Sequence, residues 1–386
     1  MKIALLTTDN RENEHNYSCA EPSFGTAPEA LLRGFRELRD LEVHVVSCLK
    51  KRVAAPERLA PNIFYHAVVV PGIGWLKTGY LGCILAVRSK LKEIGPDAVH
   101  GQGSERDCAI CAVFSGYPNV VTLHGNMRLV AKLAKAKPWS YLGLTAALEN
   151  VVLPRAGGVV CISTYTRENV RKLNHFTWIV PNAVDPSFFE IQRKPHELPT
   201  ILCVGMVCPR KNQNTLIEAL VPLREKREFS LLFLGKAPPD AVYTERFLRL
   251  VTKHSWIRHA GFTGRAELRE ELAKATVLVL PSLEDNCPMV ILEAAAAGVP
   301  VVAARVGGVP DLVEHNVTGL LCNSYKDTEV RDCVQLVLEN REHAQKMAIQ
   351  AKQRAIERFH PSAVAEQHIK IYAEILGRRA RVTANV

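Results

Sequence analysis

Residues 280–308 read LPSLEDNCPMVILEAAAAGVPVVAARVGG, and this stretch decides the fold. The apolar residues 277–280 lead into Pro281, as a buried parallel strand does where it ends. A polar loop follows, and then a helix from Pro288 to about Ala297, where Gly298 ends it. A second buried strand is expected over 299–304. A strand, loop, helix and strand in this order are typical of a doubly wound parallel sheet.

The start of this helix, around Met289 and Val290, predicts an anion-binding site, because the first backbone N–H groups of a helix have no partner within it. Asp285 and Glu293 flank that position with seven residues between them. Carboxylates accept two hydrogen bonds from neighbouring hydroxyls, so a diphosphate between two sugars would use all three parts. The alternative is that Asp285 caps the loop and Glu293 is a solvated helix residue.

The pattern Asp285-x7-Glu293, followed by Ala294 and AAAGVPVVA, resembles the signature of the retaining, nucleotide-sugar-dependent glycosyltransferases of family 4 (glycosyl transferases group 1). The family usually has Glu at both ends of this motif. Asp285 keeps the charge but shortens the reach by one methylene, and Glu284 is an alternative partner. The resemblance implies an α/β GT-B fold, with two Rossmann-like doubly wound domains facing a central cleft.

The length and composition agree with two soluble domains. A chain of 386 residues exceeds one ordinary domain, and two of roughly 180 residues are expected. Hydrophobic residues make up 47% and charged residues 23%, and no apolar run is long enough to cross a membrane. The segment MKIALLTT reaches Asp9 at once, so it is interpreted as a first buried strand rather than a signal peptide.

The domain boundaries follow from these patterns. We expect an acceptor-side Rossmann-like domain over 1–182, a linker over 183–199 and a nucleotide-sugar-binding Rossmann-like domain over 200–358. A last helix over 359–386 should cross back to the first domain. The linker has charges and prolines that suit a connecting segment.

The cysteines indicate a reducing compartment. Eleven are scattered through mostly apolar runs, as expected of buried, reduced thiols in a cytoplasmic protein. Cys108 and Cys111 form a C-x-x-C pair, but the sequence shows no second pair and no histidine cluster beside it. We interpret both as buried thiols on a helix face rather than metal or redox groups.

The formal net charge of +10 predicts anionic partners. Nucleotide sugars, acidic glycans and anionic lipid headgroups qualify, whereas nucleic acid is not expected because no aromatic-rich basic motif is present. Four cations alternate with apolar residues over 128–139. This segment is either a solvated basic face, which we favour, or an amphipathic helix against anionic lipid or glycan. The latter would give peripheral membrane association at the cytoplasmic face. The four cations are Arg128, Lys132, Lys135 and Lys137.

In the first half, three residues fall at predicted carboxyl ends of strands, where ligands bind in such sheets. Gly25, in Phe-Gly-Thr rather than Gly-Gly, resembles the glycine loop that approaches the donor. His124 in THG resembles the strand-end histidine that contacts the donor sugar. His100 is the weaker candidate, and a lone strand-end histidine is often structural.

In the second half, Arg210 and Lys211 follow a strand that ends at Gly205. Lys211 matches the family's lysine for the donor diphosphate. The family's arginine position is Met206 here, so Arg210 is expected to supply the second positive charge. A solvated loop pair is the alternative.

The sequence therefore predicts a retaining glycosyltransferase that moves a hexosyl-type sugar from a UDP- or GDP-sugar to a glycan, lipid or small-molecule hydroxyl. His124 and Asp285 are the catalytic candidates. The donor-binding candidates are Gly25, Arg210, Lys211, Met289, Val290 and Glu293. No metal or other cofactor is expected. The alternatives are a nucleotide-sugar epimerase on the same architecture and a non-catalytic nucleotide- or glycan-binding protein.

Overall fold

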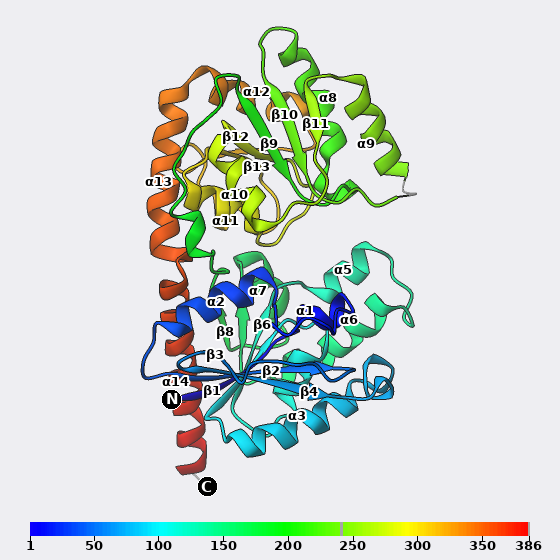
Figure 1. The fold of residues 1–386 in the computed structure, drawn as a ribbon, viewed down its shortest axis with the longest axis vertical. Coiled ribbons are helices and arrows are strands. Elements are labelled where there is room, and N and C mark those ends of the chain that lie inside the picture. The colour runs from blue at the N-terminus through cyan, green and yellow to red at the C-terminus, as the bar shows by residue number, and fades with distance from the viewer. Residues whose placement is uncertain (240–241, 385–386) are drawn as a thin grey trace. The chain divides into compact units, whose positions relative to one another are not determined.

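A computed structural model describes residues 1–239 and 242–384. The chain divides into two compact units. Unit 1 contains Met1–Ala183 and the C-terminal helix that starts at Pro361, and unit 2 contains Val184–His360. Helices flank the sheet of each unit in Figure 1.

Unit 1 is built on an eight-stranded sheet in the order β3-β4-β2-β1-β5-β6-β7-β8. Its pairings are parallel except for the short edge strand β3, which pairs antiparallel with β4. Side chains on both faces of the central strands are buried, which explains why the strands are apolar without alternation. The strands are β1 (Lys2–Leu6), β2 (Glu42–Leu49), β3 (Arg58–Ala60), β4 (Ile63–Val69), β5 (Ala98–Gln102), β6 (Asn119–Leu123), β7 (Val159–Cys161) and β8 (Thr177–Ile179).

Two apolar layers cover the faces of this sheet. In one of them, Phe35 of α2 packs with Tyr372 of the last helix, α14. Ser163 caps α7, accepting a hydrogen bond from Thr166 N at 3.1 Å, as a serine at a helix start does. The helices of unit 1 are α1 (Asn10–Asn13), α2 (Thr26–Arg36), α3 (Leu81–Ile94), α4 (Asp107–Val113), α5 (Met127–Leu133), α6 (Tyr141–Val152), α7 (Thr164–Val170) and α14 (Pro361–Ala384).

Unit 2 is built on a six-stranded parallel sheet in the order β11-β10-β9-β12-β13-β14. The strands are β9 (Thr200–Val204), β10 (Ser230–Leu234), β11 (Ile257–His259), β12 (Val277–Leu280), β13 (Val301–Ala304) and β14 (Leu320–Cys322). The helices are α8 (Gln213–Arg224), α9 (Val242–Lys253), α10 (Arg265–Lys274), α11 (Met289–Ala297), α12 (Asp327–Glu339) and α13 (Arg341–Phe359).

The helix predicted in the opening stretch is α11, and every residue from Val290 to Ala297 is buried. Gly298 ends it with a φ of 70°, a left-handed conformation that glycine adopts without strain. Pro288 is its N-cap rather than its first helical residue. The short elements α1, β3 and β8 were not predicted, whereas α4 is the helix that was expected to carry Cys108 and Cys111. No helix within the described residues is long and apolar enough to span a bilayer.

Candidate functional site

Two loops at the carboxyl ends of neighbouring strands form the candidate site in unit 2. The loop after β9 contains a 3₁₀ turn over Pro209–Lys211, and the loop after β12 contains Ser282–Asp285. Because β9 and β12 pair in parallel, both loops leave the same edge of the sheet. Leu283 N donates to Arg210 O at 2.8 Å, which ties the two loops together.

Asp285 is the centre of this loop pair. Lys211 Nζ lies 2.5 Å from Asp285 Oδ2, and Arg210 Nη1 lies 3.6 Å from Asp285 Oδ1. Ser282 Oγ donates to Asp285 Oδ2 at 3.1 Å. Arg210 also donates to the Glu284 carbonyl at 3.0 Å. The structure therefore brings the predicted cations and the first predicted carboxylate together, and it places Glu284 beside them.

Glycine shapes the backbone that holds Asp285. Gly307 has a φ of 52°, and a Cβ there would lie 1.9 Å from Asp285 O. Gly308 N donates to that same oxygen at 3.0 Å. The Gly-Gly turn after β13 thus packs directly against the Asp285 backbone and hydrogen-bonds to it. A side chain at position 307 would clash with that backbone.

The cations differ in exposure. The Lys211 side chain is 14% exposed, whereas that of Arg210 is 46% exposed. Glu284 is partly buried, and burial raises the pKa of its carboxyl, with Arg210 opposing that shift and Asp285 adding to it. Met206, at the position where the family has arginine, is an exposed hydrophobic residue.

The first turn of α11 begins after this loop. Its N-cap, Pro288, provides no side-chain hydrogen bond to the helix. Ile291 N donates to Pro288 O at 3.0 Å, and Met289 and Val290 precede it in the first turn. A helix start of this kind can bind an anion through its amides and its dipole.

Glu293 lies further along α11 and is 6% exposed. Burial raises the pKa of its carboxyl to about 7, with Arg265 opposing and Asp185 adding to the shift. Arg265 Nη1 lies 3.1 Å from Asp185 Oδ2. Glu293 therefore has a different set of charged neighbours from Asp285.

The sequence did not predict Arg265 or Asp185 as a neighbour of Glu293. Arg265 begins α10 after Gly264, and Asp185 begins a 3₁₀ turn over Pro186–Phe188. Both residues lie where a helix or turn begins, and nothing in the sequence links either of them to Glu293.

In unit 1, His124 follows β6. Its Nε2 lies 2.8 Å from Gln102 Oε1, and it also hydrogen-bonds with Asn182. Burial lowers the pKa of His124 to about 4, although the Asn182 hydrogen bond opposes that shift. The imidazole is therefore neutral at physiological pH, so one ring nitrogen can donate a hydrogen bond and the other can accept one.

His100 and Gly25 have simpler surroundings. His100 is fully buried, and its ring nitrogens lie 2.6 Å from the Tyr372 hydroxyl and 2.7 Å from the Thr122 hydroxyl. That is a structural role in the core. Gly25 is the N-cap of α2, without a side-chain cap, and its φ of −60° is open to any residue.

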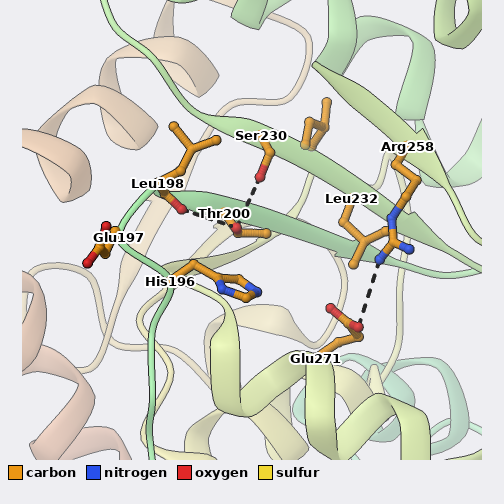
Figure 2. Close-up of a pocket in the computed structure, with 9 residues that line it drawn as sticks. His196, Glu197, Leu198, Thr200, Ser230, Leu232, Arg258 and Glu271 are labelled. Atoms are coloured by element: carbon orange, nitrogen blue, oxygen red, sulfur yellow. Dashed lines mark hydrogen bonds and ion pairs between the residues drawn. The ribbon is translucent and has the colours of Figure 1, made fainter. Parts of the chain in front are cut away.

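A separate cavity of about 600 Å³ lies at the other edge of the unit 2 sheet. Thr200 and Ser230, the first residues of β9 and β10, line it, and their hydroxyls are 3.0 Å apart (Figure 2). Arg258 and Glu271 also face it, 3.8 Å apart. None of the predicted site residues lines this cavity. It is distinct from the loop pair at the carboxyl edge.

Two family profiles match successive parts of the chain. Glycosyltransferase Family 4 matches residues 28–188, and Glycosyl transferases group 1 matches residues 184–354.

Among curated proteins, a GDP-mannose-dependent alpha-(1-6)-phosphatidylinositol monomannoside mannosyltransferase of Mycobacterium tuberculosis is 34% identical over 174 residues. That match covers 42% of this chain and 44% of the mannosyltransferase, so it spans less than half of the relative's length. An alpha-maltose-1-phosphate synthase of Mycolicibacterium smegmatis is 25% identical over 300 residues, covering 69% of this chain and 75% of the synthase.

Solved structures share the whole architecture. Sucrose-phosphate synthase from Thermosynechococcus elongatus superposes with a TM-score of 0.76 at 18% identity, covering 98% of this chain and all of that one. Anabaena HepE in complex with UDP superposes with a TM-score of 0.71 at 18% identity, covering 97% of this chain and all of HepE. These likenesses confirm the predicted fold of two Rossmann-like domains.

Proposed function

The chain belongs to the glycosyltransferases of group 1 and family 4, and we propose that it transfers a hexosyl-type sugar from a UDP- or GDP-sugar to a hydroxyl of a glycan, lipid or small molecule. The observation that carries this proposal is the convergence of Lys211 and Arg210 on Asp285 beside the start of α11. Cations, helix amides and a carboxylate together suit a diphosphate with a sugar attached.

Lys211 is proposed to hold the donor diphosphate together with Arg210. An ammonium group has three donors, so Lys211 can keep its bond to Asp285 and still bind a phosphate oxygen. Arg210 is more exposed and can turn toward the same anion. The amides of Met289 and Val290 add hydrogen bonds from the helix start.

In the proposed reaction the bond between the sugar C1 and the phosphate oxygen breaks, and a bond from C1 to the acceptor oxygen forms on the same face. The acceptor proton passes to the departing diphosphate, so the anomeric configuration is retained. Lys211 and Arg210 stabilise the charge that grows on the leaving group. The residues proposed for this step include no metal ligand, and we propose that it needs no metal.

The two carboxylates are proposed to bind the sugars on either side of the diphosphate by accepting hydrogen bonds from their hydroxyls. Asp285 contacts the transferred sugar, and Glu293 accepts hydrogen bonds from the ribose. His124, as a neutral imidazole, is proposed to contact a sugar hydroxyl, and Gly25 to leave the backbone at the α2 start open to the donor.

We also propose that α5 and the loop after it contact an anionic membrane. Leu133 and Trp139 are 59% and 76% exposed, beside Lys132 and Lys135. Apolar side chains among cations suit a lipid surface, and the name of the mycobacterial relative includes phosphatidylinositol. Co-sedimentation with anionic vesicles should exceed that with zwitterionic ones, and Trp139→Ala should reduce it. Tyr325→Ala, a control at an exposed aromatic residue of unit 2, should not.

A panel of UDP-, GDP- and ADP-sugars tests the function. The preferred donor should raise the melting temperature, and with acceptors present NMR should show a product with the donor's anomeric configuration. Conversion of the donor sugar without an acceptor would instead indicate an epimerase. Binding without turnover across acceptor classes would indicate a non-catalytic binding protein.

A further inference from the structure

Three thiols and one carboxylate meet in the core of unit 1. Cys48 lies near the end of β2, Cys83 in the first turn of α3, and Asp107 and Cys111 one turn apart on α4. We call these four residues the Cys48 cluster. Their exposed fractions are 5%, 0%, 6% and 1% respectively, so the cluster is closed to solvent.

Three of the four ligand atoms of the cluster are close together. The sulfurs of Cys48 and Cys83 and a carboxylate oxygen of Asp107 all lie within 4.8 Å of one another. Cys48 also interacts electrostatically with the thiols of Cys83 and Cys111 and with the Asp107 carboxyl. Zinc binds sulfur at ~2.3 Å and carboxylate oxygen at ~2.0–2.2 Å, so tetrahedral ligands stand roughly 3.8 Å apart. Small side-chain movements would bring Cys48, Cys83 and Asp107 to that spacing.

Charge favours a cation at this position. A carboxylate removed from water among apolar side chains is costly unless a positive charge accompanies it. Arg106 is the cation that interacts with Asp107, and its guanidinium also lies over the Trp75 ring at 5.2 Å. Three thiolates and Asp107 would carry four negative charges. A divalent ion together with Arg106 would balance three of them, whereas without an ion Arg106 alone among the described residues faces the cluster.

We propose that the Cys48 cluster binds a zinc ion that joins β2, α3 and α4. Cys48, Cys83 and Asp107 are the ligands, and Cys111 supplies the fourth position. Each thiol that binds releases its proton to solvent. Thiolates select zinc over magnesium or calcium, and the carboxylate favours zinc over copper(I). The role is structural and independent of the proposed sugar transfer, because no residue of the cluster belongs to the donor site.

The site was not visible in the C-x-x-C motif, because only one of its two cysteines takes part. Cys108 instead lies with its sulfur 3.7 Å from the Thr8 hydroxyl. Cys48 and Cys83 come from a strand and a helix far away in the sequence, and Asp107 lies next to Cys108 on α4 itself. Cys108 is therefore a matched control on the same helix, equally buried and outside the cluster.

The test is the metal content of the full-length protein. Wild type from zinc-supplemented cells should contain about one zinc per chain by mass spectrometry. Asp107→Asn and Cys83→Ser should lose that zinc, whereas Cys108→Ser should keep it. Asp107→Asn preserves side-chain size, so it gives a readout if Cys83→Ser does not fold.

Cobalt gives a second readout that identifies the ligands. Protein expressed in zinc-poor, cobalt-supplemented medium should show thiolate-to-cobalt charge-transfer absorption and tetrahedral d–d bands, both absent from Asp107→Asn. The proposal is overturned if wild type holds neither metal. It is also overturned if the variants keep as much zinc as wild type, or if peptide mapping finds a Cys48–Cys83 disulfide.

Discussion

Lys211 Nζ donates to Asp285 Oδ2 at 2.5 Å, across 74 positions of the sequence. The bond joins the loop after β9 to the loop after β12, and both groups are largely buried. Removing either partner would leave the other charge without its main counter-ion. The two residues form one ion pair but have different proposed roles, since Lys211 binds the diphosphate and Asp285 contacts the transferred sugar. Substituting Lys211 should therefore affect nucleotide affinity, and substituting Asp285 should affect turnover.

Asp285→Asn keeps the size of the side chain but removes its charge. Lys211 would then be free for the diphosphate, so the affinity for UDP or GDP should be retained or rise, while kcat falls because the contact to the transferred sugar is weakened. Calorimetry with the nucleotide and steady-state kinetics separate the two effects. A loss of nucleotide affinity with kcat unchanged would reverse the assignment of Asp285 and Glu293.

The affinity for the donor should depend on pH through Glu293. Its pKa is raised to about 7, so below that pH the carboxyl is protonated and accepts fewer hydrogen bonds from the ribose. Affinity for a nucleotide sugar should therefore rise from pH 6 to pH 8. Glu293→Gln should bind more weakly and lose that pH dependence. An unchanged slope in the variant would show that another group titrates.

The same pKa predicts an effect on stability without any ligand. Between about pH 4.5 and 7 the unfolded chain releases the Glu293 proton before the folded one does, so this group's contribution to the free energy of unfolding falls as pH rises. At pH 8 Glu293→Gln should be the more stable protein, by on the order of 3 kcal/mol. Near pH 5 the two melting temperatures should be similar. An equal difference at both pH values would contradict the shift.

Gly307→Ala should unfold at a lower temperature than wild type. The φ of 52° costs a non-glycine residue about 1–2 kcal/mol, and the new Cβ would also meet Asp285 O at 1.9 Å. Gly261→Ala is the matched control, because Gly261 has a φ of 74° with no neighbouring atom within 4 Å of the added Cβ. If both variants lost the same amount of melting temperature, the turn at Gly307 would have moved enough to avoid the clash with Asp285.

The sequence was informative where its signals are local. Continuous apolar runs predicted the strands on either side of α11, and Gly298 marked a helix end that the structure confirms. Placing Lys211 and Asp285 at one sheet edge was possible because parallel strands end together.

What could not be predicted depends on distant packing. Glu293 on α11 interacts electrostatically with Arg265 on α10 and with Asp185 before the 3₁₀ turn at Pro186. No sequence pattern indicates that these three residues lie close together. His100 looked like a site residue until Tyr372, from the last helix, was found to satisfy it. Cys48, Cys83 and Asp107 likewise meet only in the folded chain. Their proximity follows from tertiary contacts rather than from spacing.

Nucleotide affinity of Lys211→Ala tests the central claim most directly. Titration with UDP and GDP should show binding weaker than wild type by about 1.5–3 kcal/mol, or roughly 10- to 150-fold, because a charge-assisted contact to the diphosphate is lost. Lys346→Ala, a control at an exposed lysine on α13 that pairs with Glu342, should bind like wild type. If Lys211→Ala binds both nucleotides as tightly as wild type and turns over the donor at the same rate, Lys211 does not hold the diphosphate.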